Sequence, residues 1–256
     1  MLLHHLDAGN GPPVVLLHGL FGAARNFGTV QRALAPLFRT IALDARNHGA
    51  SPHGAAMDYA TLAEDVRETL AALHVPRAAV IGHSMGGKTA MMLAVRDPCL
   101  VGRLLVADIA PVVYRHGNND VAAAMRAIPL HPSPTRGSAD AALSSAVPDP
   151  AVRAFLIQNL VFGPAPHWRI GLEHIAAAIP DLEGWSTPPG SFAGPALFVS
   201  GARSNYVLPE HRPAIRALFP AARFVAVKNA GHWLHADNPA GFLSVVESFL
   251  HDWAGQ

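Results

Sequence analysis

The stretch AAVIGHSMGGKTAM, residues 78–91, decides the fold. It begins with a short apolar run that is typical of a strand buried on both faces, and it ends in small and apolar residues that favour a packed helix. Between them lies a Gly-x-Ser-x-Gly pattern, which predicts a sharp strand-to-helix turn with Ser84 at its apex. Gly82 and Gly86 remove the clashes that side chains would cause in so tight a turn. The pattern therefore predicts a nucleophilic Ser84 hydroxyl that projects above a sheet.

Apolar runs on both sides of this turn predict the rest of the sheet. They are continuous rather than alternating, as in strands buried on both faces of a parallel sheet, and they lie at residues 14–18, 40–43, 104–107, 196–199 and 224–227. Helical patterns separate them, with apolar stripes over residues 59–73 and 238–253. The alternation predicts an α/β fold with a mostly parallel central sheet flanked by helices.

Between residues 112 and 189 this alternation stops. The segment is rich in Ala and Pro, contains no convincing strand, and has helical candidates at residues 120–127, 151–161 and 167–179 and a loop at 131–138. We therefore expect a helical cap inserted between two strands of the sheet. The predicted division is an α/β core of residues 1–111 and 190–256 and a cap of residues 112–189.

Composition excludes several classes of function. Half of the 256 residues are hydrophobic and 14% are charged, so the chain can build a large core. A formal net charge of +1 gives no basic excess for binding nucleic acid. The one cysteine, Cys99, excludes an internal disulfide and a Cys-based zinc site. No stretch reaches the ~20 apolar residues of a membrane span, and the first residues do not look like a signal peptide, so we expect a cytoplasmic protein.

A second glycine-bearing turn is HGLFG, residues 18–22, which follows the first of the apolar runs. Such a strand exit can offer a backbone N–H to a developing oxyanion, and we expect Leu20 to provide it. Met85, at the helix N-terminus directly after Ser84, is expected to provide the second N–H. Phe21 would then face the acyl group, whereas His18 would support the loop. A simple strand exit without a catalytic role is the alternative.

The serine hydroxyl needs a base, and the sequence offers His232 on the loop between the last predicted strand and the final helix. His235 lies three residues further on, so the pair resembles half of a metal site. No nearby Cys or Glu completes it, so we expect no metal.

The base in turn needs a carboxylate. The turn after the 196–199 strand has Asn205 where an Asp would be expected, and an amide cannot stabilise an imidazolium by charge. We therefore assign the acid to Asp108, at the end of the strand that follows the nucleophile helix, because strand ends on this edge converge. A structural role in the following turn is the alternative for Asp108. Whether Asn205 assists His232 stays open.

Five segments together carry a resemblance to a known family: HGLFG, DARNHGAS, GHSMGGKTAM, VADIAPVVY and AGHWLHAD. The chain resembles the small bacterial α/β-hydrolase esterases of the YbfF type, with mitochondrial abhydrolase relatives. The resemblance covers residues 13–114 and 195–253 and is weak across the insertion. It implies carboxylesterase or thioesterase activity on acyl substrates without a cofactor, and it places the acid in the DIAP segment, at Asp108. The sequence has room for only one strand before Val14, so the sheet edge is expected to be truncated.

These observations predict a serine hydrolase that cleaves small-molecule esters of short to medium acyl chains through an acyl-enzyme on Ser84, His232 and Asp108. We expect a monomer or homodimer that binds no nucleic acid and has no membrane-spanning segment. The apolar substrate pocket is expected to be lined by aromatic residues, namely Phe21, Trp168, Trp185, Tyr206 and Trp233. Lys88 is interpreted as a structural or surface charge. Alternatives are carbon–carbon bond hydrolysis or acyl transfer on the same residues, or a hydrolase-like receptor with low turnover; Ser84 argues against a dehalogenase with an Asp nucleophile.

Overall fold

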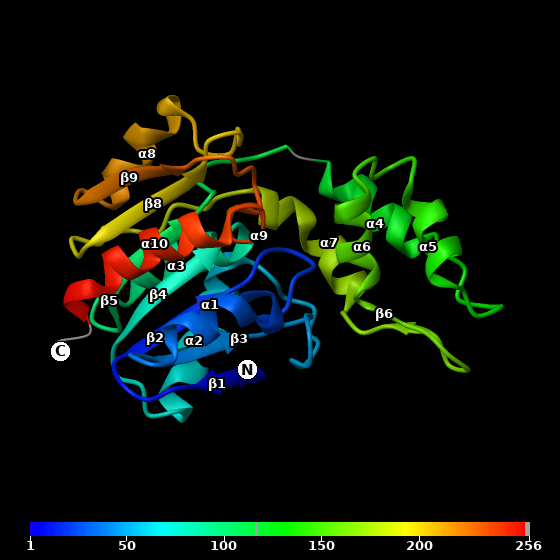
Figure 1. The fold of residues 1–256 in the computed structure, drawn as a ribbon, viewed down its shortest axis with the longest axis horizontal. Coiled ribbons are helices and arrows are strands. Elements are labelled where there is room, and N and C mark those ends of the chain that lie inside the picture. The colour runs from blue at the N-terminus through cyan, green and yellow to red at the C-terminus, as the bar shows by residue number, and fades with distance from the viewer. Residues whose placement is uncertain (116, 254–256) are drawn as a thin grey trace.

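The computed structural model describes residues 1–115 and 117–253. Its centre is a seven-stranded sheet in the order β1-β3-β2-β4-β5-β8-β9 (Figure 1). The strands are β1 His5–Ala8, β2 Pro13–Leu17, β3 Arg39–Leu43, β4 Ala78–His83, β5 Val101–Ala107, β8 Ala196–Gly201 and β9 Ala222–Val227. Among the described strands of this sheet, only the edge strand β1 is antiparallel to its neighbour. The predicted α/β class with a mostly parallel sheet is confirmed, as is the single strand before Val14.

The strand register explains how distant residues meet at one edge. Leu17 of β2 lies opposite Gly82 of β4, and His83 of β4 lies opposite Ala107 of β5. The carboxyl ends of these three parallel strands therefore meet, and ligands bind at that edge in open α/β sheets. β4 is buried along its whole length, as its continuous apolar run predicts. β9 differs, since it is an edge strand and exposes part of its apolar run.

Helices cover both faces of the sheet and make two hydrophobic layers. Helices α1 (Gly28–Leu34) and α10 (Pro239–Leu250) pack on one face, whereas α2 (Tyr59–Ala72) and α3 (Met85–Arg96) pack on the other (Figure 1). Alternate residues of β2 point into the two layers. The remaining short elements of the core are η1 Ala24–Phe27, η2 Pro209–His211, α8 Arg212–Leu218, α9 Leu234–Asp237 and η3 His251–Trp253.

Residues 112–189, called the insertion below, lie between β5 and β8. Their elements are α4 Asn118–Arg126, α5 Arg136–Leu143, α6 Pro150–Ile157, β6 Leu160–Val161, β7 His167–Trp168 and α7 Leu172–Glu183. Figure 1 shows α4, α5 and α6 to one side of the sheet, with α7 between them and the sheet. The division of the chain into a core and a cap stays a prediction.

Three details of the insertion differ from the expectations. β6 and β7 form a two-stranded antiparallel sheet where only helices were expected. The helix expected from residue 167 begins at Leu172, because residues 167–168 pair in that sheet and Gly171 precedes the first turn. α5 begins within the expected loop, because the Thr135 side chain accepts a hydrogen bond from Ser138 N and caps the helix. Two-residue strands are too short to leave a periodic pattern in a sequence.

Among residues 1–115 and 117–253, no helix combines the length and the apolar character that crossing a membrane requires.

Candidate active site

Ser84 lies at the apex of the turn between β4 and α3, in a strained backbone conformation with φ 52° and ψ −118°. The neighbouring glycines are sterically required. A Cβ at Gly82 would lie 2.2 Å from the carbonyl oxygen of Gly86, and a Cβ at Gly86 would lie 2.2 Å from that of Leu17. Ser84 N donates a hydrogen bond to Ala107 O at 3.0 Å, which ties the turn to β5. The turn therefore has the geometry that the Gly-x-Ser-x-Gly pattern predicts.

Two side chains from distant segments reach this serine. Ser84 Oγ lies 3.1 Å from His232 Nε2, and His232 Nδ1 lies 2.9 Å from Asp108 Oδ2. The structure thus joins the three residues that the sequence singled out into one continuous chain of hydrogen bonds. The carboxylate is fully buried, whereas the imidazole side chain is 16% exposed. A nucleophile, a base and an orienting carboxylate in this order can perform acyl transfer.

Asp108 is held from several directions. Its backbone has a positive φ of 53°, and its N–H donates to Val199 O at 2.8 Å. Its Oδ1 accepts a hydrogen bond from Gly201 N at 3.0 Å, and its Oδ2 accepts one from the Ser204 hydroxyl as well as from His232. These donors satisfy a charge that would otherwise be costly to bury. Ser204 was not anticipated from the sequence, since a lone serine in a turn has no distinguishing pattern.

Asn205, which occupies the expected position of an acid, is exposed on the turn after β8. Its neighbour Ser204 is the residue of this turn that contacts Asp108. The structure gives no hydrogen bond between Asn205 and His232 within residues 1–115 and 117–253. Asp108 therefore reaches the imidazole from β5, the strand next to the nucleophile strand.

The backbone N–H groups of Leu20, on the loop after β2, and of Met85, the first residue of α3, lie next to the segment of Ser84, and both residues line the cavity beside it. In the described part of the chain, neither N–H has a hydrogen-bond acceptor. Phe21 differs, because its N–H donates to His48 Nε2 at 3.1 Å and its backbone has a positive φ of 60°. Among the described residues, Leu20 and Met85 thus keep unpaired backbone N–H groups at the cavity, and their role in binding an oxyanion stays a prediction.

Buried histidines fix the loop that carries Leu20. His18 Nδ1–H donates to Gly19 O at 2.8 Å, and its Nε2 accepts from Ala45 N at 3.0 Å. His48 Nδ1–H donates to Arg46 O at 2.9 Å, which leaves Nε2 to accept from Phe21 N. Burial lowers the pKa of His18 and lowers that of His48 to about 3, so both rings are neutral and can accept a hydrogen bond. His18 therefore supports the loop, as expected.

Two more histidines lie near His232. His83 Nε2–H donates to His232 O at 2.8 Å, which fixes the backbone of His232. The rings of His83 and His235 lie 4.8 Å apart. Burial lowers the pKa of His83 well below its usual value and that of His235 to about 4. Within residues 1–115 and 117–253, no cluster of His, Cys, Asp and Glu has the arrangement of a metal site.

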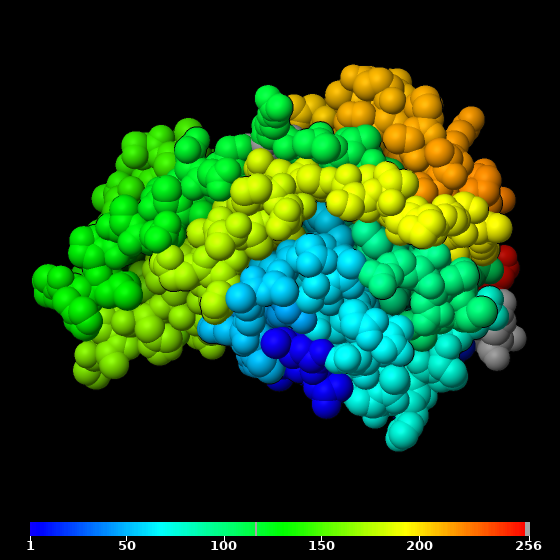
Figure 2. All heavy atoms as spheres, turned by 180° about the vertical axis from the view of Figure 1, so that it is seen from behind, coloured from blue at the N-terminus to red at the C-terminus, as the bar shows by residue number. Residues whose placement is uncertain are grey.

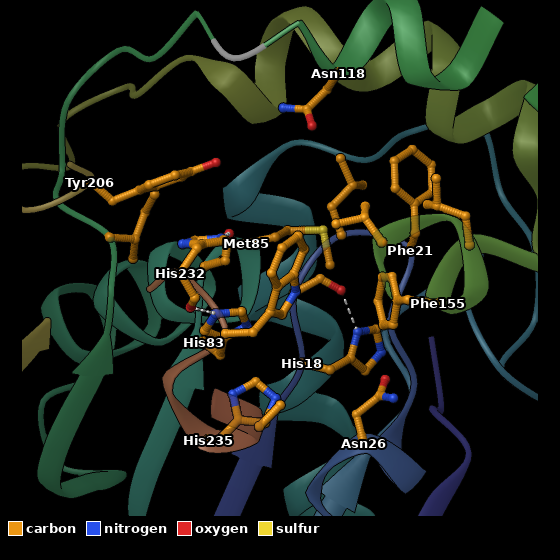
Figure 3. A pocket seen from close by; sticks show the side chains of 18 of the residues that line it. His18, Phe21, Asn26, His83, Met85, Asn118, Phe155, Tyr206, His232 and His235 are labelled. Atoms are coloured by element: carbon orange, nitrogen blue, oxygen red, sulfur yellow. Dashed lines mark hydrogen bonds between the residues drawn. The ribbon is translucent and has the colours of Figure 1, made fainter. Parts of the chain in front are cut away.

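A cavity of about 810 Å³ lies beside Ser84 and His232. Figure 3 shows Phe21 and Phe155 on one side of it and Tyr206 and His232 on the other. Of the five expected pocket residues, three line the cavity, namely Phe21, Tyr206 and Trp233. Its apolar wall includes residues of both the core and the insertion, namely Ile109, Val121, Val152, Phe155, Leu156 and Leu182.

The structure does not place Trp168 and Trp185 among the residues that line this cavity. Trp168 pairs with Leu160 in the two-stranded sheet of the insertion. Trp185 packs against Tyr59, with the ring centroids 6.0 Å apart. Both side chains are thus used in packing, which an aromatic residue in a sequence does not distinguish from pocket lining.

The chain matches the family model of the α/β-hydrolase fold over residues 12–239, and it belongs to this family. The sn-1-specific diacylglycerol lipase ABHD11 of Mus musculus is 41% identical over 248 residues, which cover 93% of this chain and 81% of the mouse protein. Esterase YbfF of Escherichia coli (strain K12) is 36% identical over 244 residues, which cover 95% of this chain and 94% of the bacterial protein.

A solved structure described as a marine microorganism esterase is also similar, with a TM-score of 0.94 and 33% sequence identity over 98% of this chain and 100% of that one. The chain is therefore a hydrolase of the esterase and lipase type within the α/β-hydrolase family. The resemblance to the YbfF-type esterases, which the sequence motifs carry, is confirmed.

Proposed function

We propose that this protein is a serine carboxylesterase that cleaves esters of short to medium acyl chains through an acyl-enzyme. The observation that carries the proposal is the chain of hydrogen bonds from Ser84 through His232 to Asp108, at the wall of a largely apolar cavity. The names of the relatives, an esterase and a diacylglycerol lipase, support ester substrates. A thioester would react on the same groups.

In the acylation step, Ser84 Oγ attacks the ester carbonyl carbon while His232 Nε2 takes the hydroxyl proton. The carbonyl oxygen becomes an oxyanion, which the N–H groups of Leu20 and Met85 bind. Asp108 keeps the imidazole oriented and stabilises the positive charge that it acquires. His232 then gives the proton to the leaving alcohol oxygen as the carbon–oxygen bond breaks, which leaves the acyl group on Ser84.

In the deacylation step, a water molecule occupies the place of the alcohol. His232 takes a proton from the water, whose oxygen attacks the acyl carbon and forms a second oxyanion in the same place. When the bond to Ser84 Oγ breaks, His232 returns the proton to the serine. The products are a carboxylic acid and an alcohol, and no cofactor takes part in either step.

The cavity supports substrates with apolar parts. Phe21 and Trp233 line it beside the triad, and Phe155 adds an aromatic wall from the insertion. We include in this proposal the division into a core of residues 1–111 and 190–256 and a cap of residues 112–189, because both contribute lining residues. A cytoplasmic location stays a prediction.

The proposal is tested by labelling the purified protein with a fluorophosphonate and by assaying nitrophenyl esters of increasing acyl length. We expect stoichiometric labelling that Ser84→Ala abolishes, and a decrease in turnover of ~10⁴-fold for Asp108→Asn. Label that survives in Ser84→Ala removes Ser84 as the nucleophile. Activity of Asp108→Asn close to wild type places the acid elsewhere. A protein that binds these esters without a burst of nitrophenol would be the low-turnover receptor instead.

A further inference from the structure

Lys88 is a buried lysine in the first turns of the nucleophile helix α3, four residues after Ser84. The residue is only 1% exposed, which excludes the surface alternative of its interpretation as a structural or surface charge and leaves the structural one. The proposed mechanism does not use it. The chain contains one other lysine, Lys228, which is exposed. A buried lysine needs partners for its amino group, and those partners show what it holds in place.

The partners of Lys88 lie at the C-terminal end of α7. Lys88 Nζ donates hydrogen bonds to Gly184 O at 2.6 Å and to Glu183 O at 3.2 Å. The last carbonyl groups of a helix have no partner within the helix and carry a partial negative charge, so a cation is favourable there. Lys88 thus connects the nucleophile helix of the core directly to the last helix of the insertion.

Two tyrosines hold the same end of α7, one from the core and one from the first residues of the insertion. Tyr59 OH donates to Leu182 O at 2.5 Å, and Tyr114 N donates to Glu183 O at 2.8 Å. The Lys88 amino group also lies 5.4 Å from the ring centroid of Tyr59 and 4.9 Å from that of Tyr114, which are cation–π distances. The carbonyl groups of residues 182, 183 and 184 are therefore all held by groups from outside α7.

The held end of α7 forms part of the substrate cavity. Leu182, Glu183, Lys88 and Tyr59 all line it, together with Ser84. Figure 2 shows the segment that contains α7 and the residues after it, in yellow-green to yellow, lying across the molecule between the green helices of the insertion and the light-blue part of the core. The position of this segment against the core therefore sets one wall of the cavity.

The ammonium form of Lys88 carries a cost. Burial lowers the pKa of Lys88 to about 7, against a smaller opposing effect of the Glu183 carboxylate. An apolar residue of similar length would avoid this desolvation, but it would leave Gly184 O without its donor. The lysine is thus poorly explained by packing alone and well explained by the bonds that it makes to α7.

We propose that Lys88 is a positioning residue that fixes the α7 wall of the cavity and thereby selects esters long enough to reach it. The proposal rests on the proposed esterase function and adds a determinant of its substrate range. Lys88 takes no part in the chemistry at Ser84. Small esters that do not reach the wall are expected to react equally well with or without its amino group, whereas long esters depend on it.

The test compares wild type with Lys88→Met, Lys88→Gln and the exposed matched control Lys228→Met. For each, kcat/KM is measured with nitrophenyl acetate, nitrophenyl octanoate and octyl acetate, and rates are referred to active sites titrated with a fluorophosphonate. In Lys88→Met we expect kcat/KM for nitrophenyl octanoate, for octyl acetate or for both to fall roughly tenfold relative to kcat/KM for nitrophenyl acetate, because KM for the long ester rises. Lys88→Gln keeps an N–H donor and should recover part of the ratio. Lys228→Met should leave both ratios unchanged.

Ratios that stay at the wild-type value in Lys88→Met overturn the proposal, and so does an equal loss with all three esters, which is the result of a merely structural role. Tyr59→Phe provides a second route if Lys88→Met does not fold, because it removes only the bond to Leu182 O. It should shift the ratios in the same direction by a smaller factor, and unchanged ratios there also count against the proposal. A wild-type protein that hydrolyses none of the esters overturns the esterase function and this inference together.

Discussion

The ring of Tyr206 lies flat against the imidazole of His232, with the ring centroids 3.7 Å apart and the planes inclined by 18°. Tyr114 in turn stacks against Tyr206, with the ring centroids 5.6 Å apart. The base is thus held by an aromatic face in addition to its hydrogen bonds with Ser84 and Asp108. The imidazole acquires positive charge during the proposed reaction, and an aromatic face stabilises a cation.

This stacking predicts the effect of Tyr206→Leu. Removing the ring leaves His232 with fewer contacts and removes the stabilisation of the imidazolium, so kcat for nitrophenyl acetate should fall about tenfold. Tyr206→Phe keeps the ring and should retain most of the activity. Equal activity of the leucine and phenylalanine variants would show that the stacking does not contribute.

Loss of the Ser204 hydroxyl is expected to lower kcat less than the loss of the Asp108 carboxylate does. Its hydroxyl donates to Asp108 Oδ2 and accepts from Tyr206 N at 3.2 Å. Ser204→Ala removes a donor from a buried carboxylate, so kcat should fall roughly tenfold, since a hydrogen bond to a charged group contributes about 1.5–3 kcal/mol. Ser204→Thr keeps the hydroxyl and serves as the control. The measurement is kcat per titrated active site, and a wild-type value for Ser204→Ala would contradict the assigned contact.

Gly86→Ala tests the steric argument for the nucleophile turn. The added Cβ would lie 2.2 Å from Leu17 O, which is backbone and cannot move aside. The free energy of unfolding, measured by urea titration, should fall by about 3 kcal/mol or more. Gly28→Ala is the matched control, because its Cβ would meet only the end of the Arg32 side chain, at 3.6 Å, and alanine favours a helix. A small loss in Gly86→Ala would show that the turn adapts.

Buried neutral histidines predict a loss of stability in acid. The pKa of His48 is lowered to about 3 and that of His235 to about 4 in the folded protein, from an ordinary value of 6.5. Between these values and 6.5 the unfolded chain binds more protons, so the free energy of unfolding falls as the pH decreases below 6.5.

His235→Phe isolates one part of this effect. His235 stacks near Phe27, and its Nδ1 is buried without a partner in the described part of the chain, so a phenyl ring is tolerated there. Urea titrations at pH 7, 5.5 and 4.5 should show a shallower loss of stability for His235→Phe than for wild type. The exposed residue His251 supplies the control His251→Gln, which should follow wild type. Parallel curves for all three proteins would show that His235 titrates normally.

The sequence was sufficient to predict the sheet and the three residues that meet at its edge. Ser84 and His232 each lie in a local pattern, and Asp108 followed from Asn205 in the usual position of the acid and from the convergence of parallel strand ends. Ser204 was missed because its contact with Asp108 depends on the turn after β8, which has no sequence pattern of its own.

Other features depend on contacts that no local pattern records. The burial of Lys88 comes from α2 and from the end of α7, far along the chain. Trp168 and Trp185 have the composition of pocket residues, but the structure uses them in packing. In the insertion, the presence of helices was predicted better than their first and last residues, because short elements between prolines carry few periodic positions.

The insertion leaves the sheet through the segment that carries Asp108, and Tyr114 secures this exit. Its hydroxyl accepts a hydrogen bond from Ala110 N at 2.9 Å and donates one to Tyr206 O at 2.6 Å, while its backbone N–H donates to Glu183 O. A chimera that exchanges insertions between relatives must therefore be joined after Tyr114 and before Leu182. Crossover points closer to the sheet would replace Tyr114 or the end of α7, which anchor the insertion. They would thereby also disturb the position of Asp108.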